Sequence, residues 1–276
     1  MPGLFSRYLK YGWRFFSATA LLVLILWLVY ISLEQTYIFH WNQALRSLHN
    51  YNQGLKITLS ISLISMFVSL GLGIIIAMGR LSRWTIVRDL SGVFVHSLRN
   101  LPFIVVVLLF YFGLRQAFPI DRLFSPWRRV DIWGVPIFDG RFIWGVLALS
   151  IFEASFIAEI FRGGIQAIHK EQGEAARSLG MSYFQSMRYV ILPQAFRVII
   201  PPLTNELVAL VKESSLLFII SLEELTQTAR LQYSTGRPFV FEYYTILAAY
   251  YLMLTIPLSI LSHFLERRLA VGDRNR

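Results

Sequence analysis

Long apolar runs alternate with short polar connections along the whole 276-residue chain. Six of these runs carry few or no charges and reach the roughly 20 helical residues that are needed to cross about 30 Å of hydrocarbon. They are Phe15–Leu33, Ile57–Gly79, about Ser91–Leu114, Phe142–Phe161, about Phe196–Ile220 and Tyr243–Leu261. The pattern predicts an all-α polytopic membrane protein with six transmembrane helices.

The first run follows Arg7, Lys10 and Arg14, so it has to be distinguished from a secretory signal peptide. The apolar part of a signal peptide usually spans about 7–15 residues and ends at a small-residue cleavage site. This run is longer, and it ends in Val-Tyr-Ile-Ser-Leu-Glu-Gln. We therefore expect it to be retained as a span.

The composition supports a membrane protein and narrows its partners. Hydrophobic residues make up 55% of the chain and charged residues 15%, whereas soluble domains are typically about 25% charged. The net charge of +10 is spread over the connections without a basic helix or an aromatic stacking motif, which argues against nucleic-acid binding. The absence of cysteine excludes disulfides and thiolate metal sites.

The basic residues also predict an orientation. Six spans place both termini on one side of the membrane, and that side receives 14 Lys and Arg residues, against nine in the opposite loops. The positive-inside rule then places both termini in the cytoplasm, together with the connection between the fourth and fifth spans.

That cytoplasmic connection has the pattern of two helices joined by a turn. Lys170–Leu179 shows mostly small or polar side chains, and Gly180 follows it, as glycine commonly follows a helix. Ser182 and Gln185 have the spacing of a capping box that starts a second helix, which we expect to end before Pro193. Such a segment either rests on lipid or docks into a partner, and the small side chains slightly favour docking.

The same connection resembles the EAA loop of ABC importer permeases. Glu174-Ala175-Ala176 is followed after three residues by Gly180 and after nine more by Val190-Ile191-Leu192-Pro193. The resemblance implies that Glu174, Ala175, Ala176, Gly180, Leu192 and Pro193 couple the permease to a separate ATPase.

The wider sequence resembles the polar amino-acid uptake branch of these permeases, with a leaning towards the glutamate/aspartate type. Phe156–Ile168 and Pro201–Leu217 match the branch's segments on either side of the EAA loop. Asn100, Leu101 and Val106 depart from its Arg-Gly-Thr-Pro-Leu-Leu-Val-Gln pattern. The resemblance covers roughly residues 51–269, which we expect to form the permease domain.

The family implies a particular assembly. We expect residues 1–50 to hold a cytoplasmic tail, an additional span and an outer loop, and residues 270–276 to form a second cytoplasmic tail. The implied partners are a cytoplasmic ABC ATPase, an extracytoplasmic substrate-binding protein and a second permease subunit, as homodimer or heterodimer, in a bacterial inner membrane. The chain has no phosphate-binding Gly-x-x-x-x-Gly-Lys-Ser/Thr motif. The resemblance then implies that ATP and Mg²⁺ belong to the partner ATPase and that this chain is a transport subunit without a cofactor of its own.

Polar residues at membrane depth are costly and are candidates for the substrate pathway. Glu153 lies near the middle of the fourth run, where it either pairs with a cationic group of the substrate or forms a structural hydrogen bond. Glu159 is three residues before Arg162, and we favour an ion pair between them. Four polar residues interrupt the fifth run: Asn205, Glu206, Lys212 and Glu213. The cluster resembles the pathway-lining span of the family, so Asn205 is a candidate for the pathway, and for Lys212 we favour a structural pairing with Glu213 or Glu153.

Two other functional classes remain open from the sequence. An ion-coupled secondary transporter would explain the spans and the intramembrane carboxylates but not the EAA loop. A membrane scaffold would predict that Glu153 and Asn205 have no influence on flux. Within the importer class, the substrate is a polar amino acid: glutamate or aspartate, glutamine, or a basic amino acid.

Overall fold

The computed structural model describes residues 20–21, 23–24, 27–28, 30–32, 37–127, 130–234 and 239–270. The chain divides into two compact units, Met1–Arg46 and Ser47–Arg276. In the first unit, the described residues between 20 and 32 are helical and α2 (Trp41–Leu45) follows. The expected first span, Phe15–Leu33, falls only in part within the described residues.

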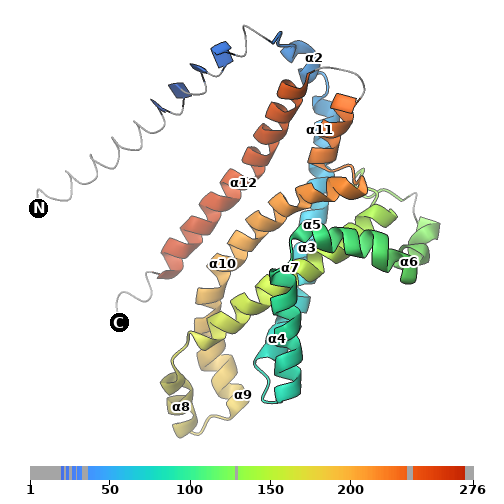
Figure 1. The fold of residues 1–276 in the computed structure, drawn as a ribbon. Helices are drawn as coiled ribbons and strands as arrows, with labels where there is room; N and C mark the ends of the chain where they lie inside the picture. Colours follow the sequence, from blue (N-terminus) through green and yellow to red (C-terminus); the bar gives the residue numbers. More distant parts are fainter. Residues whose placement is uncertain are drawn as a thin grey trace, which may run out of the picture. The chain divides into compact units, whose positions relative to one another are not determined.

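The second unit is helical throughout its described part, apart from short connections and an isolated bridge between Ile132 and Val135. Figure 1 shows its elements in chain order. They are α3 (Leu48–Arg80), α4 (Thr85–Arg99), α5 (Phe103–Leu108), η1 (Leu109–Leu114), α6 (Arg115–Ala117), η2 (Ile120–Trp127), α7 (Gly140–Gln166), α8 (Lys170–Ser178), α9 (Tyr183–Ser186), η3 (Met187–Ile191), α10 (Leu192–Glu213), η4 (Ser214–Ile220), α11 (Leu225–Ser234) and α12 (Val240–Ala270).

Three of the described helices, α3, α7 and α12, are long and apolar enough to cross a membrane. They contain the second, fourth and sixth predicted spans. The fifth predicted span forms a continuous helical stretch, α10 followed by η4. This stretch is less apolar because it contains four charged residues, Arg197, Glu206, Lys212 and Glu213. It is therefore not among the three helices that are long and apolar enough to cross a membrane.

The third predicted span is not one straight helix. α4 ends at Arg99, α5 begins at Phe103, and the two helical segments meet at 106°. Pro102 stands at the N-cap of α5. Because proline lacks an amide hydrogen and disfavours a helical conformation at the preceding residue, it ends α4 and redirects the chain. The third predicted span is therefore bent at Pro102 instead of forming a single helix.

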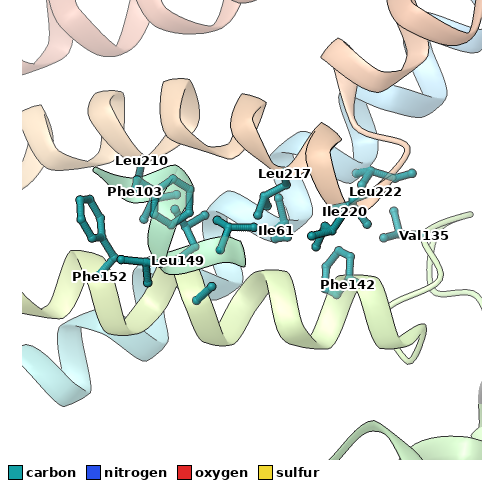
Figure 2. Packing of buried hydrophobic residues seen from close by; sticks show 14 residues of the cluster. Ile61, Phe103, Val135, Phe142, Leu149, Phe152, Leu210, Leu217, Ile220 and Leu222 are labelled. Carbon is teal, nitrogen blue, oxygen red and sulfur yellow. The ribbon is translucent and has the colours of Figure 1, made fainter. Parts of the chain in front are cut away.

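The main hydrophobic core lies where α3, α5, α7 and the α10–η4 stretch meet. Figure 2 shows Ile61 of α3 and Phe142 and Leu149 of α7 in one cluster with Leu210 and Leu217. The helix α7 is central, because 61% of its most apolar window is buried, against 22% for α12. The exposed apolar faces of α4 and α12 are thus available to lipid or to another subunit.

Close contact between α3 and α7 depends on a glycine. A Cβ atom built on Gly73 would lie 2.5 Å from Ile157 Cγ2, whereas one on Gly71, two residues earlier in the same helix, would meet nothing within 4 Å. We expect Gly73→Leu to lower the free energy of unfolding by about 1–3 kcal/mol because it overpacks this contact. Thermal unfolding in mild detergent, followed by circular dichroism, measures the effect. Gly71→Leu is the matched control, and an equal loss of stability in both variants would contradict the explanation.

Candidate functional site

The connection between α7 and α10 contains a tight, exposed turn. Gly180 has a φ of +85°, and its amide donates to the Arg177 carbonyl at 2.9 Å, while the Met181 amide donates to the Ala176 carbonyl at 3.2 Å. These two bonds are those of a Schellman motif, which ends a helix and requires a left-handed residue. The predicted glycine stop after α8 is confirmed. Glu174 and Ala175 are exposed on α8, and Ala176 is buried.

The second helix begins as predicted but does not end as predicted. The Ser182 hydroxyl accepts from the Gln185 amide and the Gln185 side chain accepts from the Ser182 amide, which confirms the capping box. The helical path then runs from α9 through the π-helical turn η3 into α10. Leu192 and Pro193 form the first turn of α10, where proline needs no amide partner. The expected stop before Pro193 is wrong.

The turn and the second helix present apolar side chains outward. Leu179 is 82% exposed, Tyr183 62% and Phe184 69%. A cavity of about 610 Å³ lies between the end of α7, α8 and the α9–η3 stretch. Large exposed apolar groups grouped on a compact turn are characteristic of a surface that another molecule covers.

Charged side chains join the second helix of this connection and the end of α7 to the neighbourhood of the α3–α4 connection. The Arg83 guanidinium, in the connection between α3 and α4, lies 5.8 Å from the centre of the Tyr183 ring. Glu159 of α7 accepts from Arg80 at the end of α3 at 3.0 Å and from Arg162 at 2.7 Å. The expected pairing of Glu159 with Arg162 is thus present, and Arg80 extends it to a second helix.

We expect Glu159→Gln to destabilise the protein by about 1–3 kcal/mol, because it removes the negative charge between two partly buried arginines and replaces one of the two accepting oxygens with an amide NH₂ group. The measurement is thermal unfolding in detergent. Asp89→Asn removes the exposed ion pair between Arg88 and Asp89 and should change stability by less than about 0.5 kcal/mol. If the two variants lose the same stability, Glu159 does not brace the helices.

Three carboxyl groups gather between α7 and α10. The Glu153 side chain, only 1% exposed, interacts with both Glu213 and Glu206. Oε2 of Glu153 and Oε2 of Glu213 are buried and form no hydrogen bond within the described part of the chain. Arg99 is a nearby positive charge that acts on Glu206. The cluster can hold a proton or a cationic group that bridges the oxygens.

Asn205 and Lys212 lie apart from this cluster. The Ser262 hydroxyl of α12 donates to the Asn205 side-chain oxygen at 2.8 Å, so this amide joins α10 to α12. Lys212 is exposed and lines a cavity that residues of α12 also line. The fold therefore places the four predicted pathway residues, Glu153, Glu159, Asn205 and Lys212, in four separate environments.

Another buried carboxyl group, Glu224, caps α11 from the connection that precedes this helix. Its oxygens accept from the amides of Thr226 and Gln227, both at 2.8 Å, and from the Tyr251 hydroxyl at 3.1 Å. Burial raises the pKa of Glu224 to about 7, although these hydrogen bonds act in the opposite direction. Its ordinary value is 4.5.

This shift predicts a pH dependence of stability. Because the folded state raises the pKa of Glu224 above its ordinary value, the contribution to stability is complete below about pH 4.5 and is lost as the pH rises through about 7. We expect the unfolding midpoint to fall between pH 5 and pH 8 in the natural protein, and to fall less in Glu224→Gln. Parallel pH profiles of the two proteins would show that another group controls the dependence.

Sequence reasoning did not assign three residues that the fold brings into these sites. Glu206 and Glu213 belong to the polar cluster in the fifth run but had no role there; they are seven residues apart, a spacing that places both on one face of a helix and could have joined them in one site. The pairing of Arg80 with Glu159 joins residues far apart in the sequence and has no local signal.

Known proteins resemble this chain in sequence and in fold. A sequence profile of the family described as "Binding-protein-dependent transport system inner membrane component" matches residues 69–271. A probable glutamine ABC transporter permease protein of Bacillus subtilis is 39% identical over 79% of this chain and 93% of its own length. A glutamate/aspartate import permease protein of Escherichia coli O6:H1 is 33% identical over 85% of this chain and its full length.

A solved structure agrees with the sequence relatives. The crystal structure of an amino acid ABC transporter with histidines contains a chain that superposes with a TM-score of 0.71 at 33% identity. The match covers 84% of this chain and all of that one. The chain belongs to the family of binding-protein-dependent transport system inner membrane components and is a permease subunit of an ABC transporter rather than an enzyme.

Proposed function

We propose that this chain is the permease subunit of an ATP-driven importer of polar amino acids. The observation that carries the proposal is the Schellman turn at Gly180 with its exposed apolar neighbours, placed between α7 and α10. The relatives described above are permeases for glutamine and for glutamate and aspartate. The glutamine permease and the superposed structure are described as ABC transporter components, which favours ATP coupling over the ion-coupled alternative.

In this proposal the turn docks into a separate ATPase subunit. The surface that faces the ATPase comprises the exposed residues Glu174 and Ala175 of α8 and the turn residue Gly180. Leu192 and Pro193 link this surface directly to α10 and transmit its movement. Because α9, η3 and α10 form one helical path, closure of an ATPase pair moves α10 with the turn. Such rigid-body coupling is a common form of switching.

The membrane arrangement is also part of the proposal. Six spans, with both termini and the docking turn in the cytoplasm, are supported by the distribution of Lys and Arg. Residues 51–269 form the permease domain, between an N-terminal tail with an additional span and a short C-terminal tail. A second permease subunit and an extracytoplasmic binding protein complete the importer, and ATP with Mg²⁺ binds to the ATPase.

The substrate pathway passes the carboxyl cluster of Glu153, Glu206 and Glu213. A carboxylate in a membrane interior attracts the ammonium group that every amino acid carries. The unpartnered, buried oxygen of Glu153 supports this role. The transported amino acid is glutamate, aspartate, glutamine or a basic amino acid. The cluster does not distinguish among them, because it recognises the ammonium group that all of them share.

Purification and reconstitution test the proposal together. The tagged chain, isolated gently from its own membranes, should carry an ATPase subunit in equal amount, identified by mass. Proteoliposomes of the complex with its binding protein should take up radiolabelled amino acid when ATP is supplied, and an ionophore that collapses ion gradients should leave uptake unchanged. Uptake without ATP that the ionophore abolishes would establish the ion-coupled transporter instead.

A further inference from the structure

The helix α10 has two distinct polar faces. Glu206 and Glu213 interact with Glu153 and thus face α7. Asn205 and Lys212 are also seven residues apart, and they face α12, because Asn205 bonds to Ser262 and Lys212 lines a cavity with α12 residues. One residue of offset separates the two faces by about 100° around the helix.

The cavity on the second face has a volume of about 390 Å³ and lies between the end of α10 and the middle of α12. It is lined by Lys212, Ser215, Ala248, Tyr251, Leu252 and Thr255. Ammonium and hydroxyl groups therefore meet apolar side chains within one space. Small-molecule sites usually have this combination, with volumes of about 300–1,000 Å³.

The ammonium group of Lys212 has no carboxylate partner within 4.0 Å among the residues that the structure describes. The expected pairing of Lys212 with Glu213 or Glu153 is therefore absent. In the proposed topology Lys212 stands within the fifth span, where an unpaired charge is costly unless it faces water or an anionic ligand.

The hydroxyl groups around Lys212 are held in place by their own contacts. The Tyr251 hydroxyl lies 3.1 Å from Oε2 of Glu224 and 3.1 Å from the Thr226 hydroxyl. The Thr255 hydroxyl donates to the Tyr251 carbonyl at 2.8 Å. Side chains fixed in this way lose little conformational freedom when a ligand binds beside them.

We infer that the cavity around Lys212 binds the carboxylate of the transported amino acid, with Ser215 on the same wall as a second hydrogen-bonding group. The inference rests on the proposed function and adds a second site to its substrate pathway. The carboxyl cluster faces α7 and Lys212 faces α12, so the cavity is a site separate from the cluster. Because every α-amino acid carries this carboxylate, Lys212 recognises a group common to all substrates rather than a side chain.

The first test uses the absence of cysteine from this chain. Leu252→Cys places a single thiol in the cavity wall, which is modified with a sulfonate-bearing and, separately, a trimethylammonium-bearing methanethiosulfonate reagent. We expect Lys212→Met in this background to lower the ratio of anionic to cationic modification rates about tenfold, and Lys212→Arg to preserve it. An unchanged ratio, or a thiol that neither water-soluble reagent modifies, would overturn the inference, whether or not transport is observed.

The second test measures uptake by the reconstituted importer with radiolabelled L-glutamine, L-glutamate and L-arginine in parallel. Lys212→Met should reduce uptake of every amino acid that is transported by about tenfold, Lys212→Arg should retain most of it, and Lys56→Met on α3 should have no effect. A loss restricted to L-glutamate would show that Lys212 binds the side-chain carboxylate of the substrate instead. If the natural importer transports amino acids and Lys212→Met transports them equally well, the inference fails while the proposed function stands.

Discussion

Gly180→Asp is expected to reduce ATP-driven uptake by at least about tenfold while the amount of chain in the membrane stays normal. Gly180 has a φ of +85°, and a Cβ added to it would meet nothing within 4 Å in this chain. The new side chain therefore costs only about 1–2 kcal/mol of backbone strain in the permease itself. Its main effect falls on whatever approaches the turn from outside, which in this account is the ATPase.

The matched control for this variant is Gly163→Asp. Gly163 also has nothing within 4 Å of an added Cβ, but it lies inside α7 with an ordinary helical backbone. Uptake and co-purification of the ATPase are measured for both variants. The account predicts loss of both with Gly180→Asp and near-normal values with Gly163→Asp; equal loss in the two variants would mean that the added charge, not the turn, is responsible.

Glu153→Gln is expected to reduce uptake by at least about tenfold without releasing the ATPase. Glutamine has nearly the same shape as glutamate and can still accept a hydrogen bond, so it preserves a purely structural contact. It removes the ionisable group that in this account attracts the substrate ammonium group within the membrane. The reduction should therefore appear for every amino acid that the importer accepts, and most strongly for a basic one.

Uptake kinetics of proteoliposomes test this variant against Glu266→Gln, which removes an exposed carboxylate of α12. Chain abundance and thermal stability are recorded for both variants. Normal uptake by Glu153→Gln with normal assembly would show that the buried carboxyl group is structural. The scaffold alternative would also gain support, since it predicts no change in flux.

Local features of the docking turn could be predicted from the sequence. Gly180 and the Ser182–Gln185 pair form bonds with residues a few positions away, so their spacing alone specifies the geometry. The ion pair between Glu159 and Arg162 was predictable for the same reason, because residues three apart share a helix face.

Features that depend on how helices pack could not be predicted in the same way. The carboxyl cluster requires α7 and α10 to lie side by side, and Lys212 lacks its expected partner because it faces α12 instead. The bend at Pro102 could have been predicted from the proline itself. The apolar run continues on both sides of Pro102, however, and therefore suggested one uninterrupted helix. Pro193 predicted a helix end that the structure does not have. The π-helical turn η3 links α9 to α10, and Pro193 lies in the first turn of α10, so the helical path continues through it.

Site-specific photo-crosslinking from Phe184 tests the central claim most directly. Phe184 is 69% exposed beside the turn, and a photoreactive phenylalanine analogue at this position in cells reports what covers it. The account predicts a crosslink to an ATPase subunit, which Gly180→Asp weakens, and no such product from Phe264 on α12, which is 51% exposed. A crosslink from Phe184 to lipid alone would contradict the account, because the segment would then rest on the membrane and would not bind an ATPase subunit.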